Sequence, residues 1–254
     1  MRLAWINRFD GATLSPGSEI ASLPASNAQH AHLVKKWHTA TGVKSSHVVA
    51  DLGAQYPIDV LAVVGTNLTP TATLRLRGSN SDATGATGEI YDSTLISAGV
   101  IADYPAMYHD LGGAQTARYW RIELADAALA DNLQVGRMFL GPAWTVDREL
   151  GWDISWLDGS QVEQARGGQA WIDEGPRRRL LRFHINSTTR AEMLDNAFEI
   201  ARRNGLAEQV LALIDDGDAY VPHLSVLGYV QEMTPLVQEG ARIYRQRYHL
   251  EEAL

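Results

Sequence analysis

The chain has 254 residues, 45% of them apolar, which is enough for one large or two ordinary domains with buried cores. It contains no cysteine, which excludes disulfides, thiolate metal sites and redox chemistry at sulfur. A formal net charge of -8 argues against a surface that grips nucleic acid, because phosphate binding needs a cationic stripe.

The sequence predicts a soluble globular protein that makes no membrane contact. No segment approaches the roughly 18 consecutive apolar residues that a membrane-spanning helix needs. Residues 1–8 lack the apolar stretch of a signal peptide. We therefore expect the protein to stay in the compartment where it is made.

The first half of the chain, up to about Leu140, has the texture of an all-β domain. Short apolar runs alternate there with turn residues, and Thr, Ser, Ala and Gly are frequent. Five strands are expected, at residues 48–53, 58–65, 73–79, 117–124 and 135–141. After Gly141-Pro142 the segments become longer and more charged. This change predicts two domains, residues 1–143 and 144–254.

Two of these strands differ in their apolar pattern. Residues 117–124 alternate, so that Trp120, Ile122 and Leu124 would face the core while the residues between them face water. Residues 58–65 are almost continuously apolar, which is typical of a strand covered on both sides. Together they indicate a β-sandwich.

The second domain is expected to combine strands with a single helix. Trp152, Ile154 and Trp156 would share one face of a strand, as a two-layer β-unit requires. Residues 169–173 and 179–185 would form a hairpin around the turn residues 174–176.

The helix is predicted at about residues 189–204. Thr189 and Glu192 have the spacing of a capping box, and Asn204-Gly205 would end the helix. Its apolar stripe would cover a sheet and consists of Met193, Leu194, Ala197, Ile200 and Ala201. Further strands are expected at 209–214, 223–231 and 242–250, with a turn at 215–218.

Several polar clusters contain residue types that bind metal ions. His30 and His32, with His38 and His47, could share a metal, but no carboxylate has ligand spacing, and scattered surface histidines explain them better. Residues 80–85 and 215–218 contain acidic loops, yet neither has the glutamate that an EF-hand requires, so both are interpreted as turns.

No motif indicates catalysis. The sequence has no Gly-x-Ser-x-Gly elbow and no phosphate-cradling glycine loop leading into a helix. The adjacent carboxylates Asp173 and Glu174 fall at an expected turn, which is typical of solvated charge and not of acid–base chemistry. We expect no enzyme activity, no cofactor and no metal.

The first domain resembles the discoidin, or galactose-binding-like, jelly roll over roughly residues 20–141. The pieces that carry the resemblance, in order, are Trp37 in a Trp-His-Thr context, Asp51-Leu52-Gly53, residues 58–65, residues 74–79 followed by Asp82, residues 118–122 and residues 135–141. The resemblance implies a β-sandwich that can bind sugars, lipids or proteins through loops at one end. Fold alone does not settle which, and many members bind nothing small.

The whole chain is similar to tail-tip proteins of bacteriophages with long tails. The phrases that carry this similarity are residues 66–69, 75–79, 140–144 and 166–169, together with a sheet-plus-helix second domain. It implies a tail-tube-like ring domain and a structural subunit of the virion, most like a distal tail protein, made in the cytoplasm of the host bacterium. Known distal tail proteins usually place the ring domain first, whereas here the order is reversed.

The partners that this similarity implies are further copies in a hexameric or trimeric ring, the tail tube protein and the baseplate hub. DNA would pass through the lumen without specific binding, in keeping with an acidic second domain. The dense basic cluster Arg177, Arg178 and Arg179 is a candidate subunit contact, although charge at an edge strand also prevents stray pairing.

The alternative function is binding of a host-surface glycan during adsorption, and a third is the non-catalytic part of a carbohydrate enzyme. An exposed aromatic platform flanked by polar groups would favour the glycan. Tyr104, Tyr108 and His109, in an expected loop, are the candidates for a glycan or a partner protein. Trp37 is better explained as a core residue.

Overall fold

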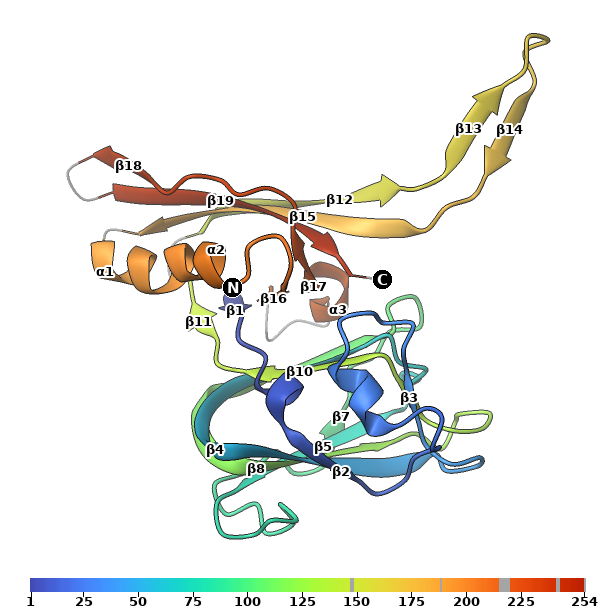
Figure 1. The fold of residues 1–254 in the computed structure, drawn as a ribbon, viewed down its shortest axis with the longest axis vertical. Coiled ribbons are helices and arrows are strands. Elements are labelled where there is room, and N and C mark those ends of the chain that lie inside the picture. The colour runs from blue at the N-terminus through green and yellow to red at the C-terminus, as the bar shows by residue number, and fades with distance from the viewer. Residues whose placement is uncertain (147–148, 188, 215–219, 241–242, 254) are drawn as a thin grey trace. The chain divides into compact units, whose positions relative to one another are not determined.

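The computed structural model describes residues 1–146, 149–187, 189–214, 220–240 and 243–253 (Figure 1). The chain is mainly β, and it divides into two compact units. Unit 1 comprises Met1–Thr145 and Leu211–Ser225, and unit 2 comprises Val146–Val210 and Val226–Leu254. The chain first passes from unit 1 to unit 2 after Thr145, close to the domain boundary expected at residue 143. Leu211–Ser225, expected within the second domain, belongs to unit 1.

Unit 1 consists of short elements around two long strands. Its elements are β1 (Arg2–Ala4), η1 (Arg8–Gly11), β2 (Thr13–Pro16), η2 (Ala25–Gln29), β3 (Trp37–His38), β4 (Ser45–Val64), β5 (Thr73–Ser79), β6 (Tyr91–Asp92), β7 (Ile96–Ser97), β8 (Ala106–Ala125), β9 (Gln134–Val135), β10 (Arg137–Gly141), β11 (Trp144–Thr145) and α3 (Val221–Leu224). The main sheet has the order β10-β4-β8-β5-β6, with β2 paired to β4 and β7 to β5.

The long strands β4 and β8 pair with each other along most of their length, but the register shifts between Asp51 and Tyr56 and again between Ile58 and Val60. Gly53 lies within the first shift at φ 77°, a conformation that glycine adopts without the strain a Cβ would cause. The strands expected at residues 48–53 and 58–65 are therefore two parts of one bent strand.

The alternation expected in residues 117–124 is confirmed in β8. Trp120, Ile122 and Leu124 are buried in the core of unit 1. Trp37 is also buried there, 1% exposed, and its indole N–H donates to the carbonyl of Ser18 at 3.1 Å. The core explanation of Trp37 is therefore confirmed.

At the start of the chain, β1 pairs on one side with β11 and on the other with β16 (Gln209–Leu213). Residues Leu211 to Leu213 of β16 provide these pairs, and all three are buried. This pairing joins Leu211–Ser225 to unit 1, although it lies far along the chain.

Unit 2 contains a twisted antiparallel sheet with the order β17-β19-β15-β12, and β18 pairs with β19. Its elements are β12 (Glu149–Asp158), β13 (Gln161–Gln164), β14 (Ala170–Asp173), β15 (Arg177–Ser187), α1 (Arg190–Glu192), η3 (Met193–Phe198), α2 (Glu199–Arg203), β17 (Val226–Val230), β18 (Val237–Gly240) and β19 (Ile243–Glu252). The residues expected to point inward from β15, Leu181, Phe183 and Ile185, are all buried.

The expected helix is present as the continuous stretch α1–η3–α2, of which η3 is a π-helical segment. Met193, Ala197 and Ile200 are buried, and the Tyr248 hydroxyl of β19 donates to the Ala197 carbonyl at 3.0 Å. Three residues of the expected stripe therefore cover a sheet, but the expectation was wrong for Leu194, which is 37% exposed. The Thr189 side chain makes no capping bond; instead, the Ser187 hydroxyl accepts from the Thr189 N–H and donates to Glu192.

The hairpin expected between residues 169–173 and 179–185 is wrong. β14 pairs with β13, and β15 pairs with β12. Gly159 and Gly175 face each other so closely that a Cβ on Gly175 would lie 2.2 Å from the Gly159 carbonyl oxygen. The chain therefore passes through 174–176 without reversing. The reversal occurs at residues 165–169, where Gly168 has φ 84° and the Ala165 N–H donates to the Gln169 carbonyl.

The strand expected at 223–231 is shorter than predicted. Its first residues form the helical turn α3, and the strand β17 begins only at Val226. Pro222 stands at the start of α3, where its missing N–H costs nothing and its fixed φ suits a helix.

Candidate functional sites

The three candidates Tyr104, Tyr108 and His109 do not form one platform. Tyr108 and His109 lie on β8 and not in a loop, because β8 begins at Ala106 and pairs them with Ala62 and Leu61 of β4. As neighbours on a strand, their side chains leave opposite faces of the sheet. The loop assignment of these two residues was therefore wrong.

Each of the three has a separate neighbour within unit 1. His109 Nε2 lies 2.8 Å from the Tyr91 hydroxyl, and burial lowers the pKa of this histidine below its ordinary value. The Tyr108 hydroxyl donates to the Ser225 carbonyl at 3.2 Å. The Tyr104 ring centroid lies 4.5 Å from that of His223.

Tyr104 does belong to an aromatic group that the sequence pattern missed. His223 lies between Tyr104 and Tyr220, and its ring centroid is 5.7 Å from that of Tyr220, which is 61% exposed. The two tyrosines are far apart in sequence, so no local spacing could have joined them. The group Tyr104–His223–Tyr220 is therefore a candidate aromatic surface of unit 1, and Tyr220 is its exposed member.

The basic cluster is divided among three acidic partners. Arg177 pairs with Asp158 at 3.3 Å, Arg178 with Glu251, and the buried Arg179 with Glu252. Each guanidinium is thus engaged within unit 2. The cluster is not a continuous cationic patch for DNA, because its charges are matched by carboxylates from β12 and β19.

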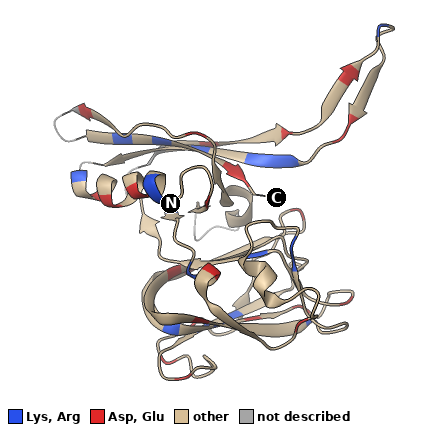
Figure 2. Ribbon diagram, viewed as in Figure 1, with Lys and Arg blue, Asp and Glu red and all other residues tan. Residues whose placement is uncertain are grey.

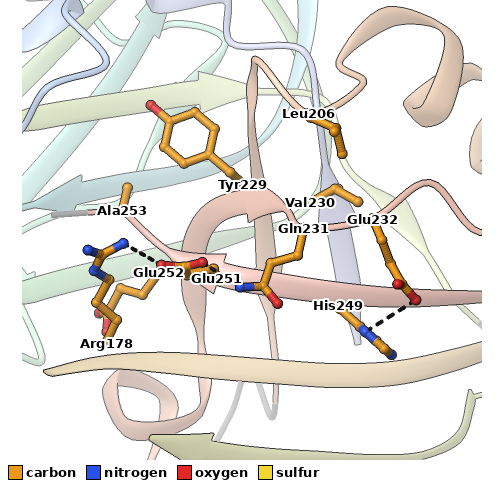
Figure 3. A pocket seen from close by; sticks show the side chains of 10 residues that line it. All are labelled: Arg178, Leu206, Tyr229, Val230, Gln231, Glu232, His249, Glu251, Glu252 and Ala253. Atoms are coloured by element: carbon orange, nitrogen blue, oxygen red, sulfur yellow. Dashed lines mark hydrogen bonds and ion pairs between the residues drawn. The ribbon is translucent and has the colours of Figure 1, made fainter. Parts of the chain in front are cut away.

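Arg178 lines a polar pocket of about 660 Å³ in unit 2 (Figure 3). The Arg178 guanidinium and the Gln231 amide both bond to Glu251, and His249 Nδ1 lies 3.6 Å from Glu232 (Figure 3). The other lining residues are Leu206, Tyr229, Val230, Glu252 and Ala253. Since its charged groups are mostly engaged with one another, the pocket has the character of a rigid polar surface and not of a reactive site.

The histidines that could share a metal have other neighbours in the structure. The rings of His30 and His32 stack at 5.7 Å, and His30 Nε2 lies 3.1 Å from the Lys35 ammonium. His38 instead contacts Asn132. Across the described ranges, no group of three or more His, Asp or Glu side chains could hold a metal ion.

The acidic loop at residues 80–85 is a turn, as expected. The Asp82 carboxylate accepts from Thr84 and Thr87, and the Gly85 N–H donates to the Asp82 carbonyl. Glu89 accepts from Thr87, Ser79 and the backbone of Ser81, and these bonds, led by that from Thr87, lower its pKa. The other acidic loop, 215–218, lies outside the described residues.

The least expected surface is the hairpin β13–β14, named here the arm. It projects from the ends of β12 and β15 beyond the sheet of unit 2 (Figure 1). Every residue of both strands is exposed, and Val162, Trp171 and Ile172 are 60%, 69% and 65% exposed. A two-glycine turn between two short β-prone runs was its signal in the sequence.

Among the helices that the structure describes, none is both long and apolar enough to cross a lipid bilayer.

Neither the comparison with protein families nor that with curated proteins gives a match. Solved structures do resemble part of the chain. A chitosan-binding module from a chitosanase/glucanase of Paenibacillus sp. IK-5 is 16% identical, covers 54% of this chain and 99% of its own, and has a TM-score of 0.42. The family 32 carbohydrate-binding module of Clostridium perfringens NanJ, solved with galactose, is 17% identical over 54% of this chain and 98% of its own, with a TM-score of 0.41.

A GH29 fucosidase from Ruminococcus gnavus, solved with fucose, is 14% identical over 55% of this chain and 27% of its own, with a TM-score of 0.42. These neighbours include carbohydrate-binding modules. The ligands in their descriptions belong to those proteins, because identities and TM-scores this low do not carry a function to this chain.

Proposed function

We propose that the protein is a non-catalytic structural subunit of a bacteriophage tail tip, most like a distal tail protein. Its second unit would build a ring that links the tail tube to the baseplate and receptor-binding apparatus, and its first unit would brace that ring. The formal charge of -8 suits a conduit that does not hold DNA. The tail-tip identity rests on the sequence resemblance, and the assembly rests on the arm.

The observation that carries the proposal is the exposure of the arm. A two-stranded hairpin alone is at best marginally stable in water, and this one has no core of its own. Val162 and Ile172 are directly opposed across the two strands, so their side chains share one face. An exposed apolar pair on a projecting hairpin is typical of a surface that another protein covers.

The purified protein should therefore form complexes larger than one 27.9 kDa chain. We expect Val162→Ser with Ile172→Ser to shift the mass measured by light scattering toward that of the monomer. The matched control is Val34→Ser, which removes a valine that is 82% exposed on unit 1 and should leave the mass unchanged. A wild-type protein that stays monomeric at tens of micromolar would argue against assembly.

A second candidate function, glycan binding by unit 1, is favoured by the group Tyr104–His223–Tyr220. The exposed ring of Tyr220, beside the half-buried His223 and Tyr104, provides a stacking surface for a sugar. Galactose and chitotriose, the sugars named with two of the structural neighbours, are suitable probes.

If unit 1 binds such a sugar, Tyr220→Ala should reduce the affinity measured by calorimetry by about fivefold or more, because a stacking ring contributes about 1–3 kcal/mol. Val34→Ser is the control, since Val34 is 82% exposed on unit 1 and does not belong to this group. No heat of binding with either sugar, or equal loss in both variants, would remove this candidate.

A further inference from the structure

The second face of the arm has a different chemistry from the apolar pair. The register pairs Gln161 with Asp173 and Glu163 with Trp171, so these four side chains share one side of the hairpin, opposite to Val162 and Ile172. We name this side the Trp171 face. Its four residues, together with Ile172, line a hollow of about 330 Å³.

The Trp171 face lacks a counter-charge. Within the part of the chain that the structure describes, Glu163 and Asp173 take part in no ion pair, and both lie beside the widely exposed indole of Trp171. Figure 2 shows these acidic positions on the two strands of the arm. Two carboxylates around an exposed indole suit a surface that is partly apolar and partly cationic.

The helix of unit 2 presents such a surface. Leu194 and Phe198 are 37% and 49% exposed and lie four residues apart. Arg202 and Arg203 follow them, both more than half exposed, and they share the single carboxylate of Glu199. We name Leu194, Phe198, Arg202 and Arg203 the helix outer face. At its Arg202–Arg203 end there is one cation more than the shared Glu199 carboxylate can match, whereas the exposed Asp195 lies next to Leu194 at the other end.

We propose that the Trp171 face of one copy docks on the helix outer face of a second copy. Trp171 would pack against Leu194 and Phe198, and Glu163 and Asp173 would pair with Arg202 and Arg203. Both surfaces have exposed apolar side chains, and the two carboxylates of the Trp171 face are opposite in charge to the arginine end of the helix outer face, which is the basis for choosing a second copy as the occupant. This inference rests on the proposed function, because it assumes that copies of the chain assemble.

The contact joins two different surfaces, so it is head-to-tail. Repeated by rotation, such a contact closes into a ring, whereas a contact between two identical patches would end at a dimer. Ring assembly would therefore proceed through the contact between the Trp171 face and the helix outer face.

The absence of cysteine allows a direct test by crosslinking. In the variant Trp171→Cys with Phe198→Cys, mild oxidation should give a ladder of disulfide-linked oligomers on a non-reducing gel. Val34→Cys with Phe198→Cys is the control, because Val34 is 82% exposed on unit 1 and belongs to neither surface of the proposed contact, and it should give little or no ladder. Equal ladders in both variants, or none in the first, would overturn the proposal.

Charge reversal provides an independent test that does not depend on disulfide geometry. Glu163→Arg with Asp173→Arg should reduce the assembled fraction in light scattering, and so should Arg202→Glu with Arg203→Glu. The variant with all four changes should recover most of the wild-type assembly, because the charges again match. Circular dichroism verifies the fold of each variant.

The outcomes separate this inference from the proposed function. A wild-type protein that never assembles contradicts both. The wild type could assemble while the variant with Trp171→Cys and Phe198→Cys gives no crosslinks and the variant with all four charge changes does not recover assembly. That combination contradicts only the interface. Quenching of Trp171 fluorescence by galactose or chitotriose, with assembly unchanged, would make the Trp171 face a sugar platform and also overturn the proposed contact.

Discussion

The neighbours that strand pairing gives to a residue determine its chemistry, and His109 shows this clearly. The sequence placed it in a loop as part of a binding platform, but on β8 its Nε2 lies 2.8 Å from the Tyr91 hydroxyl. Tyr91 in turn lies 6.2 Å from the buried Trp120, measured between ring centroids. His109 therefore sits at the margin of the core, and burial lowers its pKa.

Because the folded state lowers the pKa of His109, acid should destabilise unit 1. Below the ordinary histidine pKa of about 6.5, the unfolded chain takes up a proton that the folded chain resists. The free energy of unfolding should therefore fall as pH decreases through that value, until the lowered pKa of the folded state is reached. Urea unfolding at pH 7.5 and 5.5 measures the difference.

In His109→Gln, the loss of unfolding free energy between pH 7.5 and 5.5 should be smaller than in the wild type. Glutamine can still accept from Tyr91, but it does not titrate. His32→Gln is the control, because His32 is exposed. His47 and His184, whose pKa values burial also lowers, keep part of the acid sensitivity in every variant. An identical pH dependence in His109→Gln and wild type would show that this residue does not contribute.

Residue patterns predicted burial better than they predicted contacts. The alternation of Trp120, Ile122 and Leu124 depends on the period of the strand itself, so it could be read locally and is confirmed. The group Tyr104–His223–Tyr220 depends on Leu211–Ser225 belonging to unit 1. No local pattern encodes such a return of the chain.

At the scale of elements, close backbone approaches explain why particular glycines are required. Gly141 ends β10, and a Cβ there would lie 2.1 Å from the Ile6 carbonyl oxygen. That oxygen belongs to the backbone, so it cannot move aside as a flexible side chain could. By contrast, a Cβ added at Gly11, in η1, would have no other atom within 4 Å.

Gly141→Ala should therefore destabilise the protein by about 1–3 kcal/mol or more, because the backbone near Ile6 must shift. Gly11→Ala should change the free energy of unfolding by less than about 1 kcal/mol, and a reduced entropy of the unfolded chain could make the change favourable. Thermal and urea unfolding of both variants provide the comparison. Similar effects at the two positions would show that the approach to Ile6 does not constrain the fold.

The arm shows where element prediction from sequence fails. Residues 174–176 contain a glycine and a proline, the usual local signs of a turn, and the pattern predicted a hairpin there. The chain continues instead, because Gly175 packs against Gly159 and the Gly159 N–H donates to the Pro176 carbonyl at 3.1 Å. That constraint comes from the partner strand. By contrast, β5 was predicted with the bounds that the structure shows, since its alternation is complete within the segment.

At the scale of the whole molecule, the exposed arm and the helix outer face are unusual for a protein that works alone. A monomer rarely leaves large apolar side chains on a hairpin without a core. Closed assembly would cover these surfaces and remove exposed strand edges that favour aggregation. The basic cluster Arg177–Arg179 is paired within unit 2, and its role as a subunit contact stays a prediction. The arm is the contact that we propose.

Negative-stain imaging of the purified protein tests the central claim most directly. The wild type should form closed rings of uniform size, and the variant with Val162→Ser and Ile172→Ser should form small single particles. Single particles for the wild type, or rings that persist unchanged in the arm variant, would contradict the assignment of this protein as a ring-forming subunit that assembles through its arm.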